Sequence, residues 1–145
     1  MKSSLLILTL LAAACTTTSS AAQPYTLTKY DDATLAKVCY ADVARYQNHF
    51  DGAVTHGVWG ICGFSDRVQR PGAGSVLHNS AVFRKVGGTW TFYHKANGYL
   101  NVKELEEIRV PADVARRLYA TFIEGVCSRG DVPATEFYCA KSVRH

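Results

Sequence analysis

Cys62 is the first residue to consider for catalysis, because a thiolate attacks carbonyl carbons once a neighbouring base has taken its proton. Three histidines could supply that base, namely His56, His78 and His94. His56 and Cys62 are six residues apart, and on one regular strand that spacing separates their side chains by about 20 Å. His78 and His94 would need sheet pairing to approach the sulfur. An envelope hydrolase that uses Cys62 with a histidine is therefore an alternative, while a structural disulfide is the interpretation that we favour.

Other catalytic motifs are missing from the sequence. Residues 72–75 place a serine among small residues, but they match neither the G-x-S-x-G nucleophile motif nor a glycine-rich phosphate-binding motif. Glu104, Glu106 and Glu107 lie near the start of a predicted helix, where the helix dipole explains acidic residues better than glycosidase chemistry does. Neither C-x-x-C nor H-x-x-x-H spacing occurs, so we predict no metal site and no cofactor. The chain is expected to be a binding protein rather than an enzyme.

Two features suit the binding of another protein. The segment from Ser65 to Ser75 has loop composition and carries Asp66, Arg67 and Arg70. Arginine is common at interfaces because its planar guanidinium pairs with carboxylates. Tyr93 lies on a predicted strand face that is half polar, so it is the aromatic residue most expected at the surface. We therefore predict that Asp66, Arg67, Arg70 and Tyr93 are binding residues.

The elements that position these residues can be predicted from sequence patterns. Asp31 or Asp32 is expected to cap a helix that continues to about Asn48, because apolar residues recur there at spacings of three and four. Residues 53–64 are rich in β-branched and aromatic residues, which predicts one strand. Asn101 with Glu104 predicts the capping box of a short helix. A second helix is expected to begin at Pro111 and to end at Gly125.

The clearest local signal is a hairpin around Gly87-Gly88. Residues 76–86 and 89–95 have strand composition, and two glycines accept the positive φ angles of a type I′ turn. This turn predicts that Val86 pairs with Thr89, Lys85 with Trp90, Phe83 with Phe92 and Ala81 with His94. One face would then carry Ala81, Phe83, Trp90 and Phe92. The other would carry Val82, Arg84, Thr91 and Tyr93 and would be partly solvated.

These elements predict an α+β fold in one globular domain over residues 23–145. We expect a small antiparallel sheet with the Gly-Gly hairpin at its centre, packed on one face against two or three helices and cross-linked by disulfides. A wholly helical fold does not suit the glycine-rich and aromatic middle of the chain.

Residues 1–22 have the composition of an export signal, with Lys2 followed by an apolar run from Leu5 to Ala14. Two forms of processing remain open. Cleavage after Ala22 would release a chain that starts at Gln23, whereas lipid modification of Cys15 would anchor the domain to a membrane. Both predict a protein outside the cytoplasm, periplasmic or secreted.

Four cysteines remain after either form of processing: Cys39, Cys62, Cys127 and Cys139. An even number in an oxidising compartment predicts disulfides, and four cysteines allow three connectivities. We favour Cys39 with Cys62 and Cys127 with Cys139, although the sequence leaves the choice open.

The charge pattern excludes nucleic acid as a partner. The formal net charge is +4, and 16 Lys and Arg residues are interleaved with 12 Asp and Glu residues rather than grouped in a basic stripe. The function that we expect is binding of another protein outside the cytoplasm, with inhibition of an envelope-directed enzyme or toxin as one form of it. A structural envelope lipoprotein anchored through Cys15 is the remaining alternative.

Overall fold

A computed structural model describes residues 25–43, 49–66, 77–129 and 139. Its strands form one antiparallel sheet in which spatial order follows chain order, β1-β2-β3-β4. The strands are β1 (His49–His56), β2 (Trp59–Asp66), β3 (Leu77–Val86) and β4 (Thr89–Asn97). The helices are α1 (Ala33–Val43), α2 (Val102–Glu107) and α3 (Ala112–Ser128). The predicted α+β class with a small antiparallel sheet is therefore confirmed.

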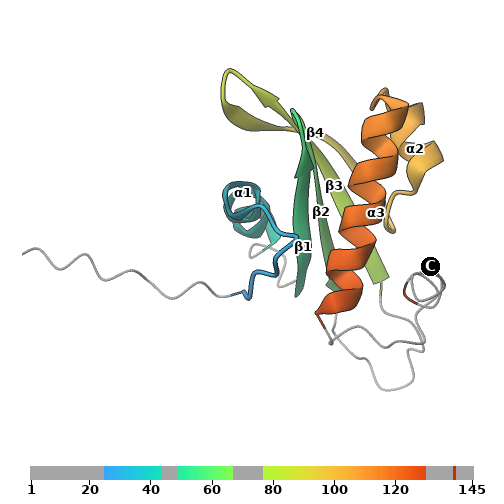
Figure 1. The fold of residues 1–145 in the computed structure, drawn as a ribbon. Helices are drawn as coiled ribbons and strands as arrows, with labels where there is room; N and C mark the ends of the chain where they lie inside the picture. The colour runs from blue at the N-terminus through green and yellow to red at the C-terminus, as the bar shows by residue number, and fades with distance from the viewer. Residues whose placement is uncertain (1–24, 44–48, 67–76, 130–138, 140–145) are drawn as a thin grey trace, which may run out of the picture.

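The helices lie on both faces of the sheet, and the expectation of one covered face is wrong. Figure 1 shows α1 on one side of the sheet and α3, with α2 beside it, on the other. One core cluster joins α2 and α3 to the sheet and includes Ile61, Val82 and Phe122. A second cluster joins α1 to the opposite face and includes Leu35, Phe83 and others. Because neighbouring residues of a strand point to opposite faces, both sets of side chains on the central strands are buried.

The predicted single strand over residues 53–64 is wrong, because the chain reverses within it. His56 pairs with Trp59, so β1 and β2 form a hairpin. Gly57, with φ 61°, supplies the left-handed residue of the turn. Both strands are buried on both faces, which removes the polar alternation that marks a half-exposed strand. The sequence therefore reads as one continuous apolar run.

Strands β3 and β4 are joined at Gly87 and Gly88, which have φ angles of 57° and 83°. The pairs Val86–Thr89, Lys85–Trp90 and Phe83–Phe92 have the register expected from that turn. The pairing of Ala81 with His94 is wrong, since a bulge shifts the register and Ala81 pairs with Lys95. The hairpin is also not central, because β4 is an edge strand of the sheet.

Close packing of α3 on the sheet depends on a glycine. A Cβ atom at Gly63 would overlap the ring of Phe122, which is 1% exposed. The ring of Phe122 also meets that of Tyr99 edge to face, with 5.1 Å between centroids. Gly125 does not end α3 as expected, because the helix continues to Ser128 and Gly125 makes room for Tyr30.

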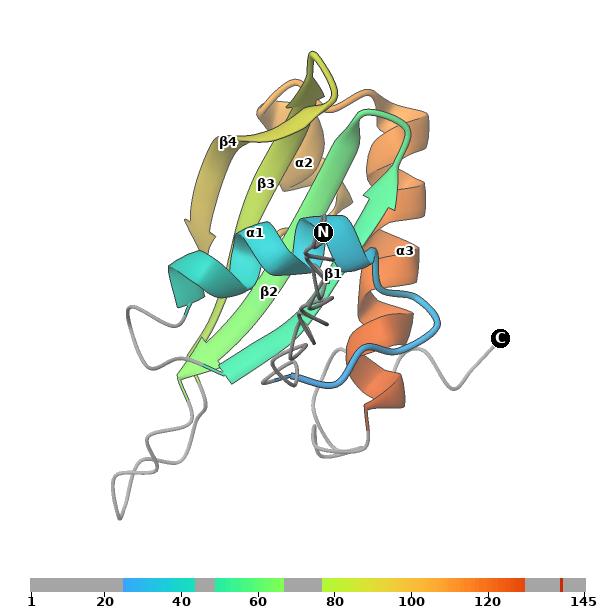
Figure 2. The ribbon, with the colours of Figure 1, turned by 90° about the vertical axis from the view of Figure 1, so that its left-hand side faces the viewer.

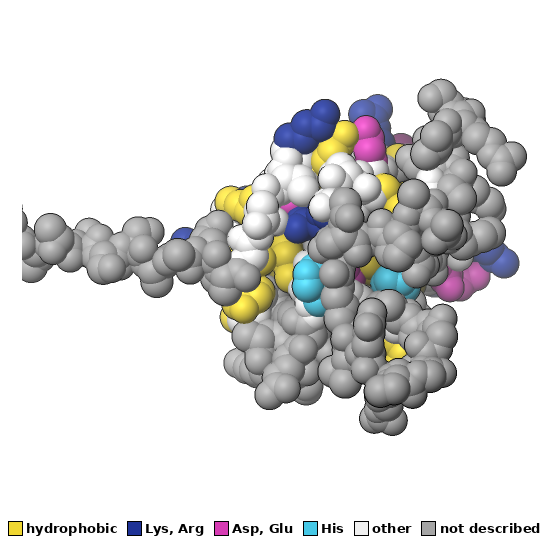
Figure 3. Space-filling model, turned by 90° about the horizontal axis from the view of Figure 1, so that it is seen from below, with side chains coloured by type: hydrophobic (Ala, Val, Ile, Leu, Met, Phe, Trp, Pro, Cys, Tyr) yellow, Lys and Arg dark blue, Asp and Glu magenta, His cyan; other side chains and the backbone are white. Residues whose placement is uncertain are grey.

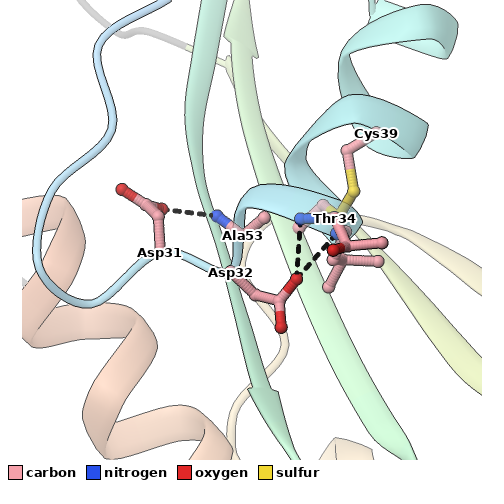
Figure 4. The surroundings of a disulfide bond; sticks show 7 residues. Asp31, Asp32, Thr34, Cys39 and Ala53 are labelled. Atoms are coloured by element: carbon pink, nitrogen blue, oxygen red, sulfur yellow. Dashed lines mark hydrogen bonds between the residues drawn. A yellow bond between two sulfur atoms is a disulfide. The ribbon is translucent and has the colours of Figure 1, made fainter.

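Asp32 caps the start of α1, and a disulfide joins the middle of the helix to the sheet (Figure 4). The Oδ1 atom of Asp32 accepts hydrogen bonds from the backbone N–H groups of Thr34 (2.9 Å) and Leu35 (2.8 Å), which confirms the predicted cap. Cys39 is bonded to Cys62 on β2. The described part of α1 ends at Val43, so the predicted end near Asn48 lies outside the described residues.

An ion pair between Asp31 and Arg129 joins the N-terminal segment to the end of α3. The side chain of Asp31 is 1% exposed and that of Arg129 is 8% exposed. Asp31 also accepts hydrogen bonds from the backbone N–H groups of Thr28 (2.6 Å) and Ala53 (2.8 Å), and Arg129 donates to the Thr26 carbonyl (2.7 Å). These bonds tie three separate segments together.

The turn between α2 and α3 contains a non-glycine residue in the left-handed region. The predicted capping box of Asn101 and Glu104 is confirmed at the start of α2, while the end of α2 requires φ 73° at Arg109.

Replacing Arg109 with glycine is expected to raise the free energy of unfolding by about 1 kcal/mol, because glycine adopts this conformation without steric cost. Urea unfolding will measure the change. Arg117→Gly, on the exposed side of α3, should instead lower the same quantity by about 1 kcal/mol.

Among the described residues, no helix combines the length and apolar character that crossing a membrane requires.

Candidate functional site

The structure places two of the four predicted binding residues. Asp66 is the last residue of β2, where it pairs with Leu77, and Tyr93 lies on β4. Arg67 and Arg70 lie outside the described residues. Tyr93 is 40% exposed, but its hydroxyl donates a hydrogen bond to the Ile108 carbonyl (2.7 Å). Tyr93 therefore also holds the α2 end against the sheet.

Cys62 has no thiol in this fold, because its sulfur is bonded to Cys39. Its cross-strand neighbours are Ala53 and Ala81, and none of the three histidines considered above is paired with it. In this oxidised structure Cys62 therefore offers no free thiolate to the hydrolase alternative. Cys127 is bonded to Cys139, so both disulfides have the connectivity that we favoured.

A polar cluster lies at the end of the sheet where β1 begins and β2 ends. Asp51 is 1% exposed and accepts hydrogen bonds from the hydroxyls of Ser65 (2.9 Å) and Tyr99 (2.7 Å). The Nδ1 atom of His49 lies 3.1 Å from the same carboxylate. Figure 3 views the molecule from below and shows histidine side chains among the described surface atoms there.

The cluster holds an imidazole whose Nδ1 atom is fixed by a buried aspartate. An aspartate that fixes the Nδ1 atom of a histidine is the arrangement found in many general bases. Here, however, the Ser65 hydroxyl donates to Asp51 rather than to His49, so the three residues do not form a catalytic triad. No group of three or more metal-ligating side chains occurs within the described ranges. We therefore interpret the cluster as a means of stabilising the buried Asp51 carboxylate.

A second surface is built by three cross-strand pairs on the α1 face of β3 and β4. The pairs are Lys85–Trp90, Phe83–Phe92 and Ala81–Lys95. We call these six residues the hairpin surface. Phe92 is 55% exposed, although it contacts the buried Phe83 edge to face with 5.9 Å between ring centroids. An exposed phenylalanine therefore lies between two lysines.

The cations of the hairpin lie over aromatic rings. The Nζ atom of Lys85 is 5.2 Å from the ring centroid of Trp90, and that of Lys95 is 5.5 Å from that of Phe64. On the opposite face Arg84 lies over Trp59 at 5.3 Å. Residues 77–97 contain these three cations and no aspartate or glutamate. The ring contacts restrict the long side chains and keep positive charge at the surface.

An open pocket of about 200 Å³ adjoins the hairpin surface on the side of α1. Phe64, Phe83 and Phe92 give it apolar walls, and the disulfide-bonded Cys39 and Cys62 also line it. The charged side chains that line it are Asp42 of α1 and Lys95 of β4. The pocket is smaller than the 300–1,000 Å³ typical of sites for drug-sized ligands, so it suits a single side chain better than a cofactor.

The placement of α1 explains why sequence patterns missed Phe92. Because side chains alternate between the two faces of a strand, Phe92 is expected on the same face as Trp90. Their pairing with Phe83 and Lys85 on β3 agrees with this. The helix on that face packs mainly against β1 and β2, so the edge of the face at β4 stays open. In Figure 2 the upper part of the β3–β4 hairpin stands clear of α1. The one available signal was the absence of acidic residues around Phe92.

The two disulfides indicate folding in an oxidising environment of the extracellular kind. No family model matches the chain, and no curated protein or solved structure matches it significantly.

Proposed function

We propose that this protein is an exported binding module that recognises another protein through the hairpin surface. The observation that carries the proposal is the exposure of Phe92 on an edge strand between Lys85 and Lys95. A large apolar side chain at the surface, surrounded by charged residues, is typical of protein interfaces. Binding of the partner would cover Phe92 and remove its apolar surface from water.

The surface is held in place before a partner arrives. The Cys39–Cys62 disulfide attaches α1 to β2, and the pocket lies between α1 and the hairpin. The lysines are restrained by their contacts with Trp90 and Phe64. A rigid surface loses little side-chain entropy on binding, which favours affinity. This property also supports inhibition of an envelope-directed enzyme or toxin as the form that the binding takes.

The position of β4 favours an extended partner segment. Of the strands described, β4 has a strand neighbour on one side only. An edge strand presents backbone N–H and C=O groups that a second chain can pair with, while side-chain pockets supply specificity. Phe92 and Lys95 line the β4 side of the pocket, and we expect one side chain of such a segment to reach the pocket past them.

The proposal predicts that Phe92→Ala weakens partner binding by more than about 1 kcal/mol, because truncation of a central aromatic residue removes most of its buried contact. The oxidised domain, immobilised, will be used to capture proteins from an envelope extract, and the affinity of each captured protein will be measured by calorimetry. Phe92 is half exposed, so folding should persist, and circular dichroism will check it.

Val58→Ala is the matched control, since Val58 is also an exposed apolar residue, 48% accessible, but lies outside the hairpin surface. It should leave the affinity unchanged. Equal affinity of the wild type, Phe92→Ala and Val58→Ala would contradict the proposal. Tyr93→Ala is a poor test, because loss of its hydrogen bond to Ile108 and its contact with Trp59 would also change stability.

A further inference from the structure

We infer that the partner segment carries an acidic, an apolar and a second acidic residue at alternate positions, so that all three face the hairpin surface. This inference rests on the proposed function and specifies the chemistry of the partner. Its occupant is an extended stretch of a different protein, paired along β4, with the apolar side chain in the pocket beside Phe92.

The spacing follows from the register of β3. Lys85, Phe83 and Ala81 are two residues apart in turn, so they lie on one face at intervals of about 6.6 Å. Their partners on β4 are Trp90, Phe92 and Lys95. Along the strand direction the surface therefore presents a cation, an aromatic group and a cation over about 13 Å, with Lys85 on β3, Phe92 and Lys95 on β4, and the extra residue of the bulge between the last two. In an extended partner segment, the side chains at positions i, i+2 and i+4 also share a face and are also about 6.6 Å apart along the strand.

The charge selects acidic residues for the outer positions. Residues 77–97 contain no carboxylate, and both lysines of the surface are exposed. The acidic group that faces the surface from another described element is Asp42 of α1, which lines the pocket together with Lys95. Its carboxylate offsets part of the attraction at the Lys95 end. The acidic residue of the partner that meets Lys85 should therefore contribute more to the affinity.

The same charges disfavour a second copy of this chain as the occupant. Pairing two β4 edges would bring Lys85 of one copy near the positive charge of the other, and residues 77–97 contain no aspartate or glutamate. Like charges brought together at an interface repel each other and disfavour that partner. An acidic segment of another protein meets no such repulsion.

Two synthetic peptides of identical composition test the inference. The matched peptide is Thr-Glu-Thr-Leu-Thr-Glu-Thr, which places both glutamates on the face of the leucine. The mismatched peptide is Thr-Thr-Glu-Leu-Glu-Thr-Thr, which places them on the opposite face. Fluorescence anisotropy of labelled peptides on the full oxidised domain is expected to give at least tenfold tighter binding of the matched peptide.

Variants of the domain locate the effect. Lys85→Glu should weaken binding of the matched peptide at least tenfold, and Asp42→Asn should strengthen it. A peptide with lysine in place of both glutamates should bind the Lys85→Glu, Lys95→Glu double variant better than it binds the wild type. These lysines are exposed, so the variants should keep the circular dichroism spectrum of the wild type.

The outcomes separate this inference from the proposed function. Equal binding of the matched and mismatched peptides overturns the inference. No peptide binding, with capture of a protein that still depends on Phe92, overturns the inference and leaves the proposed function supported. Peptide binding that is insensitive to Phe92→Ala and Lys85→Glu overturns both, because the contact would then lie elsewhere.

Discussion

Replacing Arg129 with alanine is expected to lower the free energy of unfolding by about 3–5 kcal/mol. The substitution leaves the Asp31 carboxylate, which is 1% exposed, without its cation. It also removes the hydrogen bond to the Thr26 carbonyl and the packing of the guanidinium over the ring of Phe50. Chemical denaturation followed by circular dichroism will measure the loss.

Arg116→Ala is the control for this prediction, because Arg116 is an exposed arginine on the same helix. It should change the free energy of unfolding by less than about 0.5 kcal/mol. If Arg129→Ala is no more destabilising than Arg116→Ala, the ion pair does not hold the N-terminal segment in solution. A double-mutant cycle with Asp31→Ala would then give a coupling energy near zero.

Opening the Cys39–Cys62 disulfide is expected to lower the free energy of unfolding by about 3 kcal/mol, because the bond closes a loop with a sequence separation of 23 residues. The double variant Cys39→Ala, Cys62→Ala will be compared with the wild type in urea without reductant. Both sulfurs are buried, so some loss of packing adds to the effect.

The disulfide variant also tests the link between α1 and the pocket. Partner affinity should fall if the bond holds α1 beside the hairpin surface, since Cys39 and Cys62 both line the pocket. Reductant also opens Cys127–Cys139, so the wild type under reducing conditions should be less stable than the double variant without reductant. If the wild type and the double variant have the same unfolding curve, the bond does not stabilise the fold.

Much of the fold could be predicted from local sequence signals. The cap at Asp32, the capping box at Asn101 and Glu104, and the turn at Gly87-Gly88 each depend on residues within a few positions of one another. Patterns of this range do not report which face of a sheet a distant helix will cover. The β1–β2 reversal was missed because helices cover both faces of these strands. Their residues therefore lack the alternation of apolar and polar side chains that marks a strand in the sequence.

The candidate site was harder to predict than the fold. Phe92 has the strand alternation of a core residue, and its exposure follows from the packing of α1 mainly over β1 and β2. The Asp51 cluster forms because a bulge between Phe50 and Gly52 alters the pairing of β1 with β2. Neither effect can be found without the tertiary arrangement. The disulfide connectivity that we favoured is the observed one, but the choice among three connectivities also depends on which elements are adjacent.

The coincidence of chain order and sheet order has a consequence for how the domain folds. Every strand pairs with its neighbour in the sequence, and the β1–β2 and β3–β4 turns consist of two residues each. The entropy lost in closing such short loops is small, so the sheet can assemble hairpin by hairpin without a search for distant partners. A meander of this kind reaches its transition state faster than a sheet whose neighbouring strands are far apart in the chain.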